Sequence, residues 1–236
     1  MILLVPLVAF MTHYFVTNQV DKPPSDFGNG SMFDQIATRY DLINRVLALR
    51  MDISWRQKMA NTVQQRIEAS GVAEPQLLDL ATGTADVALT LAKTIPSAKI
   101  LGLDPSNNML DVGRKKIEQQ DLPEHIRLEW ADARDLKVYP ESTFDAATMA
   151  FGIRNVPERD VALCEIHRLL KPQSVLCILE FSEPDESCEY HANMFDSLSM
   201  SLLCSPPHTF FTCVHFRLQL DFWELWRDCL SDMWYQ

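Results

Sequence analysis

The sequence predicts an α/β protein with a doubly wound parallel sheet, and two neighbouring segments carry this prediction. The first is LLDLATGTAD at 77–86, an apolar run that ends in a tight turn and leads into apolar residues at helical spacing. The second is KILGLD at 99–104, which ends at Asp104, roughly 20 positions beyond Gly83. An acid at this place can accept hydrogen bonds from both ribose hydroxyls of an adenosine. The two segments together predict an adenosine-binding site.

The residues of the turn narrow the choice of cofactor. A dinucleotide site needs G-x-G-x-x-G, but here Thr82 and Ala85 carry side chains where a pyrophosphate would crowd, so NAD and FAD are disfavoured. The phosphate-cradling pattern G-x-x-x-x-G-K-[ST] does not occur either. S-adenosylmethionine, which has adenine and ribose but no phosphate, fits the turn. An ordinary strand–turn–helix without a ligand stays open, because single-glycine turns are common in α/β proteins.

Composition is typical of a globular chain of 236 residues, with 47% hydrophobic and 22% charged residues. The net charge of −11 argues against a nucleic-acid surface, because phosphate binding needs clustered Lys and Arg. The six cysteines lack a paired framework in the first two-thirds of the chain. We therefore expect free thiols and a reducing compartment.

Three segments are predicted along the chain: a leader and linker at 1–30, a central domain at 31–184, and a divergent segment at 185–236. The apolar leader, interrupted by Pro6, is too short for a confident transmembrane helix and lacks the basic start of a signal peptide. A targeting or membrane-contact segment and an incorrectly assigned start both stay open. Helical spacing begins near Ser31, so we expect helices that cover the carboxyl edge of the sheet and exclude water.

Two later strands are expected to bring polar groups to the same edge. The run IRLEW at 126–130 ends beside Asp132, a place from which an acid or a backbone amide can read adenine, although a plain Asp turn stays open. The run at 143–151 delivers Arg154 and Asn155 to the reacting end of the cofactor. Arginine stays protonated, so Arg154 would lower the pKa of a bound hydroxyl or position a water. An Arg in an ordinary salt bridge is the alternative.

Residues 32–184 resemble the ubiquinone/menaquinone-biosynthesis C-methyltransferases of the UbiE type. The resemblance rests on MFDQIATRYDLINRVLAL, LLDLATGTADVA, GLDPSNNMLDVGRKK, FDAATMAFGIRNV, and ALCEIHRLLKP followed by LEFSEP. It implies a Rossmann-like class I S-adenosylmethionine-dependent methyltransferase sheet with N-terminal lid helices. It further implies methyl transfer to a ring carbon of a polyprenylated quinol, either a demethylmenaquinol or a methoxy-polyprenyl-benzoquinol.

The resemblance also assigns residues, partners and a location. Catalytic roles would fall to Arg154, Asn155 and Tyr40. Cofactor contacts would come from Asp79, Ala81, Gly83, Thr84, Asp104, Met109, Asp132, Ala133 and Ala150. Peripheral contact with a quinone-containing membrane is expected: the matrix side of the mitochondrial inner membrane in a eukaryote, otherwise a plastid or the bacterial cytoplasmic face. A quinone-biosynthesis complex, with the chain as an active enzyme or as a non-catalytic partner, another lipophilic acceptor, and a homodimer all stay open.

The departures from the family pattern concern glycines and the tail. The family often has glycines where this chain has Thr82 and Ala85, S-L-G where it has A-L-R at 48–50, and K-P-G-G where it has K-P-Q-S at 171–174. We expect the last of these turns to be strained or rebuilt. The tail at 185–236 does not follow the family pattern of final helices and strands. Its Cys and His residues lack paired C-x2-C spacing, so no metal site is expected.

Overall fold

The computed structural model describes residues 50–122, 124–181 and 200–205, together with positions 30, 31, 33, 34, 37, 40, 41, 44, 45 and 48. For residues 181 and 200–205 only the backbone is described. The predicted leader and nearly all of the predicted divergent tail therefore lie outside the described residues. No helix in the described part of the chain is long and apolar enough to cross a membrane.

Six strands form one sheet in the order β3-β2-β1-β4-β5-β6. Their bounds are β1 Gln76–Leu80, β2 Lys99–Asp104, β3 Ile126–Trp130, β4 Phe144–Ala150, β5 Leu170–Phe181 and β6 Met200–Ser205. The first five strands are parallel, and β6 pairs with β5 in the antiparallel direction. The chain moves outward from β1 to β3 and then returns to start β4 on the other side of β1. This reversal confirms the predicted doubly wound sheet, and ligands bind at such a switch point.

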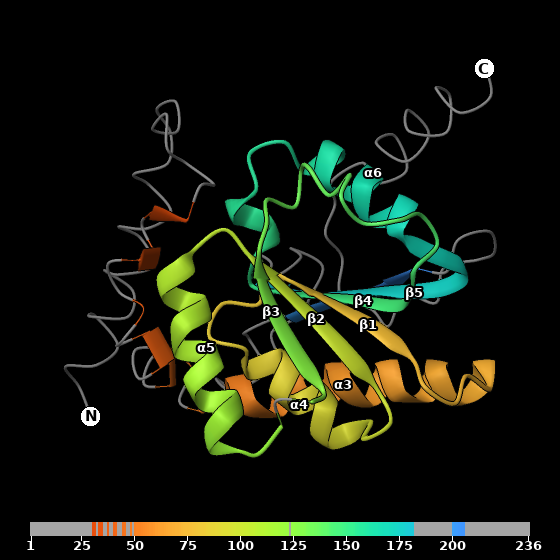
Figure 1. Ribbon diagram of the computed structural model, residues 1–236, viewed down its shortest axis with the longest axis horizontal. Coiled ribbons are helices and arrows are strands. Elements are labelled where there is room, and N and C mark those ends of the chain that lie inside the picture. Colours follow the sequence, from red (N-terminus) through yellow and green to blue (C-terminus); the bar gives the residue numbers. More distant parts are fainter. Residues whose placement is uncertain are drawn as a thin grey trace, which may run out of the picture.

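Helices cover both faces of the sheet (Figure 1). They are α3 Met51–Ser70, α4 Asp86–Thr94, α5 Asn107–Gln119, α6 Arg159–Leu169 and the short 3-10 helix η1 Ile153–Asn155. Successive side chains of a strand point to opposite faces, so Leu77 packs in the core beneath α3 and α4, whereas Leu78 packs in the core beneath α6. Figure 1 shows α3 and α4 on one side of the sheet and α6 on the other. Strands buried on both faces explain the nearly continuous apolar runs in the sequence.

Several residues that replace family glycines in this chain have an unusual backbone conformation. Three of the replacing residues have the left-handed φ that favours glycine: Arg50 at 65°, Ala85 at 66° and Gln173 at 66°. Thr82 is not among the residues with a positive φ. The strand β5 begins at Leu170, and its pairing register with β4 shifts between Leu170 and Val175, the stretch that contains Gln173. The expected rebuilt turn is therefore an irregular stretch inside β5.

The cysteine expectation is wrong at one position. Cys177 on β5 is a free, buried thiol, as predicted. Cys164 on α6 is disulfide-bonded. Spacing along the sequence does not report which cysteines the fold brings together.

Replacing Gln173 by glycine should stabilise the protein. A left-handed backbone costs an L-residue about 1 kcal/mol relative to glycine, and the exposed Gln173 side chain offers little packing in return. We expect the Gln173→Gly variant to raise the free energy of unfolding in urea by about 0.5–1 kcal/mol. Gln65, exposed in the interior of α3, supplies the control, because Gln65→Gly should lower it by about 1 kcal/mol. Equal destabilisation by both variants would contradict a strained backbone at Gln173.

Candidate active site

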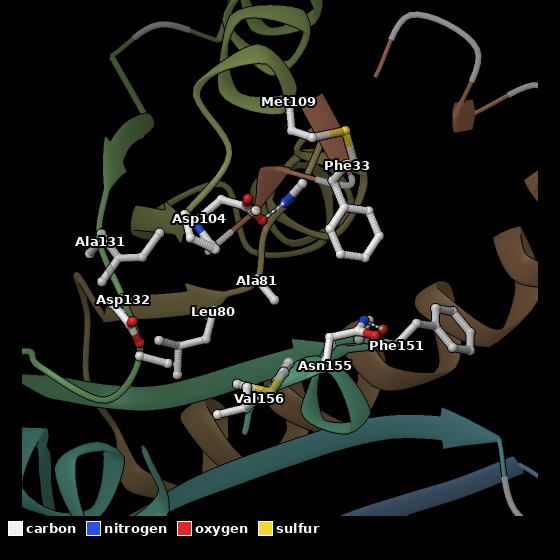
Figure 2. Close-up of a pocket in the computed structure, with 18 of the residues that line it drawn as sticks. Phe33, Leu80, Ala81, Asp104, Met109, Ala131, Asp132, Phe151, Asn155 and Val156 are labelled. Atoms are coloured by element: carbon white, nitrogen blue, oxygen red, sulfur yellow. Dashed lines mark hydrogen bonds between the residues drawn. The ribbon is translucent and has the colours of Figure 1, made fainter. Parts of the chain in front are cut away.

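A pocket of about 740 Å³ of empty space opens at the carboxyl ends of β1, β2, β3 and β4. Figure 2 shows side chains from these strand ends and from the N-terminal segment pointing toward this space. The lining residues come from segments far apart in the sequence: Gly30, Phe33, Tyr40, Leu80, Ala81, Gly83, Leu103, Asp104, Pro105, Met109, Ala131, Asp132, Ala133, Met149, Ala150, Phe151, Gly152, Asn155, Val156 and Pro157. The site therefore lies at the sheet edge predicted from the sequence.

Asp104 organises the centre of this pocket. Its Oδ2 accepts a hydrogen bond of 2.8 Å from the backbone N–H of Gly83, and its Oδ1 accepts one of 2.8 Å from the backbone N–H of Ser106. The carboxylate thus ties the turn after β1 to the start of α5, where Ser106 is the N-cap. Burial raises the pKa of Asp104 to about 6, and the two amide hydrogen bonds act in the opposite direction. Each oxygen keeps a lone pair with which to accept a ribose hydroxyl.

The turn after β1 is held from below by Asp79, which does not line the pocket. Asp79 is 1% exposed, and its carboxylate accepts hydrogen bonds from the hydroxyls of Thr82 (2.6 Å) and Thr148 (2.7 Å). Burial raises the pKa of Asp79 to about 6. Because Thr148 lies on β4, this carboxylate joins the tips of β1 and β4. The geometry gives Asp79 a supporting place beneath the cofactor turn, whereas Ala81 and Gly83 reach the pocket itself.

Asp132 and Ala133 line the wall that follows β3, and Met109 lines it from α5. Arg134 binds both oxygens of Asp132 and holds the pKa of this carboxyl below its usual range. Asp132 therefore stays ionised, as an acceptor for an amino group requires. Ala150 lines the pocket at the end of β4. The structure brings this predicted set around one cavity.

Described residues of the N-terminal segment close one side of the pocket, as expected for a lid. Phe33 and Tyr40 line the cavity, and their rings pack edge to face with centroids 6.2 Å apart. Asp34 fastens this segment to α5, because its carboxylate accepts hydrogen bonds from the Ser106 hydroxyl and from the backbone N–H of Asn108 (3.1 Å). An acid at a helix N-terminus is also favoured by the helix dipole. The lid is thus anchored beside Asp104.

A second anchor is a half-buried ion-pair network behind the cofactor turn. The Thr84 hydroxyl donates to Asp41 of the lid (2.6 Å), and the Lys116 ammonium contacts both Asp41 (2.9 Å) and Asp86. Thr84 is buried and does not line the pocket. A basic run such as 114–116 is typical of a solvated helix face, but Lys116 does not follow this pattern. Its position on α5 turns it inward, while Arg114 and Lys115 are exposed.

The predicted catalytic residues occupy different places. Tyr40 and Asn155 line the pocket, but Arg154 does not. Arg154 donates to the Oε1 of Glu180 at the end of β5 over 2.6 Å, and its side chain is 48% exposed whereas that of Glu180 is 6% exposed. Burial raises the pKa of the Tyr40 hydroxyl, while a hydrogen bond with Asn44 and the charge of Arg154 oppose the rise. The charges of Arg56 and Arg154 therefore both act on the Tyr40 hydroxyl, and that of Arg56 has the larger effect.

Sequence reasoning missed three groups at this site: Arg134, Glu180 and the lid residues Asp34 and Asp41. Glu180 lies within the quoted family stretch LEFSEP, and Asp34 and Asp41 lie within MFDQIATRYDLINRVLAL, whereas Arg134 lies in none of the quoted stretches. Among the residues that the structure describes, no group of three or more His, Cys, Asp or Glu side chains could hold a metal ion. The Cys and His side chains considered in the tail lie outside the described residues.

An α/β sheet with a carboxylate at the tip of β2 and a pocket at its switch point is the arrangement of the class I S-adenosylmethionine-dependent methyltransferase fold. A solved S-adenosylmethionine-dependent methyltransferase from Methanococcus maripaludis shares this fold, with a TM-score of 0.53 and 20% identity over 67% of this chain and 66% of that one. The [4+2]-cyclase SpnF, at a TM-score of 0.50 and 26% identity, covers 56% of this chain and 48% of its own.

Within this class the chain belongs to the ubiE/COQ5 methyltransferase family, which matches residues 25–205. The demethylmenaquinone methyltransferase of Thermus thermophilus is 40% identical over 65% of this chain and 66% of its own length. The ubiquinone/menaquinone biosynthesis C-methyltransferase of Geotalea daltonii is 40% identical over 65% of this chain and 63% of its own. The matches thus span 63–66% of the length of these relatives. Members of this family use S-adenosylmethionine.

Affinity for S-adenosylhomocysteine should fall as the pH is lowered through about 6. We expect the ionised form of Asp104 to accept the ribose hydroxyls, and burial raises the pKa of Asp104 to about 6, so the protonated form predominates below that pH. Isothermal titration calorimetry between pH 8 and pH 5 measures this change.

The same titration of substituted proteins identifies the carboxyl group that causes the pH dependence of binding. Asp104→Asn should weaken binding about 10–100-fold at pH 8 and flatten the pH dependence. The control Asp135→Asn removes an exposed carboxylate near the pocket and should behave like the unaltered chain. A pH dependence in Asp104→Asn as steep as in the unaltered chain would assign the titration to another group, such as Asp79.

Proposed function

We propose that the chain transfers a methyl group from S-adenosylmethionine to a ring carbon of a polyprenylated quinol. The observation that carries the proposal is the pocket itself: Asp104 and Asp132 line it at the ends of β2 and β3, and Tyr40 and Asn155 line the same pocket. The names of its relatives support the substrate class, because they are demethylmenaquinone and ubiquinone/menaquinone-biosynthesis methyltransferases. A quinol ring is therefore the methyl acceptor that we propose.

The proposed chemistry needs little from the protein beyond position and charge. S-adenosylmethionine supplies an electrophilic methyl group. Ionisation of a quinol hydroxyl raises the electron density on the adjacent ring carbon, which forms the new bond to the methyl carbon as the bond to sulfur breaks. The ring carbon then loses its proton to water. Arg154 stays protonated, so its role is to favour the phenolate, with Tyr40 and Asn155 as hydrogen-bonding partners.

The lid serves the same chemistry by keeping bulk water from the reacting atoms, so that only a bound water molecule is left to accept the ring proton. Phe33 and Tyr40 lie over the pocket, and the two anchors through Asp34 and Asp41 hold this segment against the sheet edge. Water exclusion protects the methyl donor from hydrolysis and strengthens the interaction of a guanidinium with a phenolate. A polyprenyl tail is insoluble in water, so peripheral membrane contact and a location at a quinone-containing membrane belong to the proposal.

The direct test supplies the purified chain with labelled S-adenosylmethionine and a reduced demethylmenaquinol or methoxy-prenyl-benzoquinol in detergent micelles. We expect a product with the label on a ring carbon, identified by mass spectrometry and NMR. Binding of S-adenosylhomocysteine without product from either quinol would contradict the proposed substrate. That result would favour a non-catalytic partner of quinone biosynthesis or a methyltransferase for another lipophilic acceptor.

Arg154→Ala should lower kcat about 100-fold or more, because the proposed phenolate loses a positive charge that favours it. The dissociation constant of S-adenosylhomocysteine should change less than about twofold, because Arg154 does not line the pocket. Arg127, whose side chain is 79% exposed on β3, supplies a matched control, and Arg127→Ala should leave both quantities unchanged. Unchanged turnover in Arg154→Ala would remove Arg154 from the mechanism.

Glu180 should affect turnover only through Arg154. Its buried carboxylate holds the guanidinium over 2.6 Å, so Glu180→Gln should lower kcat about tenfold in the otherwise unaltered chain. In the Arg154→Ala background the same substitution should have no further effect on kcat, which a double-mutant cycle measures. An equal loss in both backgrounds would show that Glu180 acts on the fold rather than on Arg154.

A further inference from the structure

Arg134 donates several hydrogen bonds to Asp132 at the rim of the pocket. Its backbone N–H donates to Oδ1 of Asp132 over 2.9 Å, and its Nε lies 3.0 Å from Oδ1 and 3.1 Å from Oδ2. Its Nη2 donates to Oδ2 over 2.6 Å. The remaining arm, Nη1, donates to the carboxylate of Glu158. One guanidinium therefore engages two carboxylates from different loops.

These contacts join two walls of the pocket. Asp132 belongs to the wall after β3, whereas Glu158 directly follows Pro157, which lines the wall before α6. Figure 2 shows Asp132 and Ala131 on the β3 side of the cavity. The side chains of Arg134 and Asp132 are 28% and 27% exposed, so the pair is half-buried rather than a freely solvated ion pair. The contact therefore has more effect than an ordinary surface salt bridge.

A planar guanidinium that binds both oxygens fixes the plane of a carboxylate as well as its charge. Each oxygen of Asp132 still has a lone pair that can accept another hydrogen bond. A carboxylate held in this way accepts a hydrogen bond from an amino group and repels a carbonyl oxygen. Adenine carries an amino group at its position 6, whereas hypoxanthine carries a carbonyl there. Asp132 can thus distinguish the two bases only if its orientation is fixed.

We propose that Arg134 is a positioning residue that sets the selectivity of the cofactor site for a 6-aminopurine, by holding the Asp132 carboxylate toward the base. This inference rests on the assignment of the pocket to S-adenosylmethionine and goes beyond it. Ionic pairing with Arg134 also keeps the pKa of Asp132 low, so the carboxylate stays an acceptor across the range in which Asp104 titrates. Glu158 accepts a hydrogen bond from Nη1 on the outer side of the guanidinium and so helps to position Arg134.

A purely structural role for Arg134 makes a different prediction, which allows a test. If the guanidinium only joins the two loops, its removal weakens every ligand of the pocket by a similar factor. If it positions Asp132, its removal weakens the amino ligand more than the carbonyl ligand. The informative quantity is therefore the ratio of two dissociation constants.

Calorimetry with S-adenosylhomocysteine and S-inosylhomocysteine measures this ratio for each variant. We expect the unaltered chain to prefer the adenosyl ligand by about tenfold or more. Arg134→Ala should bring the ratio within about threefold of unity, and Arg134→Lys should give an intermediate ratio because lysine keeps the charge but loses the planar fork. Lys137→Ala, which removes an exposed cation from the same loop, should leave the ratio unchanged.

Two results would overturn the inference. A ratio in Arg134→Ala equal to that of the unaltered chain, with both ligands weakened alike, would show a structural role only. Failure of the unaltered chain to bind either ligand would remove the cofactor assignment itself, and the inference with it. Should Arg134→Ala fail to fold, Glu158→Gln replaces it, because this variant keeps the Arg134–Asp132 pair and loosens only its outer anchor. We then expect a smaller but measurable fall in the ratio, and an unchanged ratio would contradict the proposal.

Discussion

The carboxylate of Asp104 holds together the two loops between which the cofactor must lie. Its oxygens accept the backbone N–H groups of Gly83 and Ser106, each over 2.8 Å. A buried carboxylate is costly unless such donors compensate it. Burial raises the pKa of Asp104 to about 6, and the two amide hydrogen bonds act in the opposite direction. Ribose hydroxyls would add further donors to this carboxylate, so we expect a bound cofactor to favour its ionised form.

The backbone around this carboxylate is arranged for close approach of the strand ends. A Cβ atom added to Gly152 would lie 2.5 Å from the Cβ of Ala81, so only glycine lets the chain after β4 pass the tip of β1. Ala81 and Phe151 both have a positive φ, at 50° and 57°, and both line the pocket. For a bulky residue such as Phe151 this conformation is strained. Its ring lies against Trp55 and Arg56 of α3, and these contacts hold the strained residue in place.

The parts of the fold that depend on local pattern could be predicted from the sequence. Apolar runs predicted the strands β1 to β4, and the acid at the end of the second run predicted the place of Asp104, because parallel strands place their carboxyl ends at one edge. Ser106 was also predictable as a helix cap, since its side chain serves an amide three residues away. The family resemblance added Tyr40 and Met109, whose places at the pocket no spacing rule would supply.

Contacts between distant charges could not be predicted in this way. Lys116 pairs with Asp41, 75 residues earlier, and Arg154 pairs with Glu180, 26 residues later. The partner of a long cationic side chain is chosen by the tertiary fold, so a basic run such as 114–116 gives no indication of which member turns inward. The same holds for Arg134, whose second partner, Glu158, lies on another wall of the pocket.

A crystal structure with S-adenosylhomocysteine bound tests the central claim most directly. The account predicts ribose hydroxyls within hydrogen-bond distance of Asp104 and adenine beside Asp132, whereas a ligand bound elsewhere, or with its ribose away from Asp104, would contradict it.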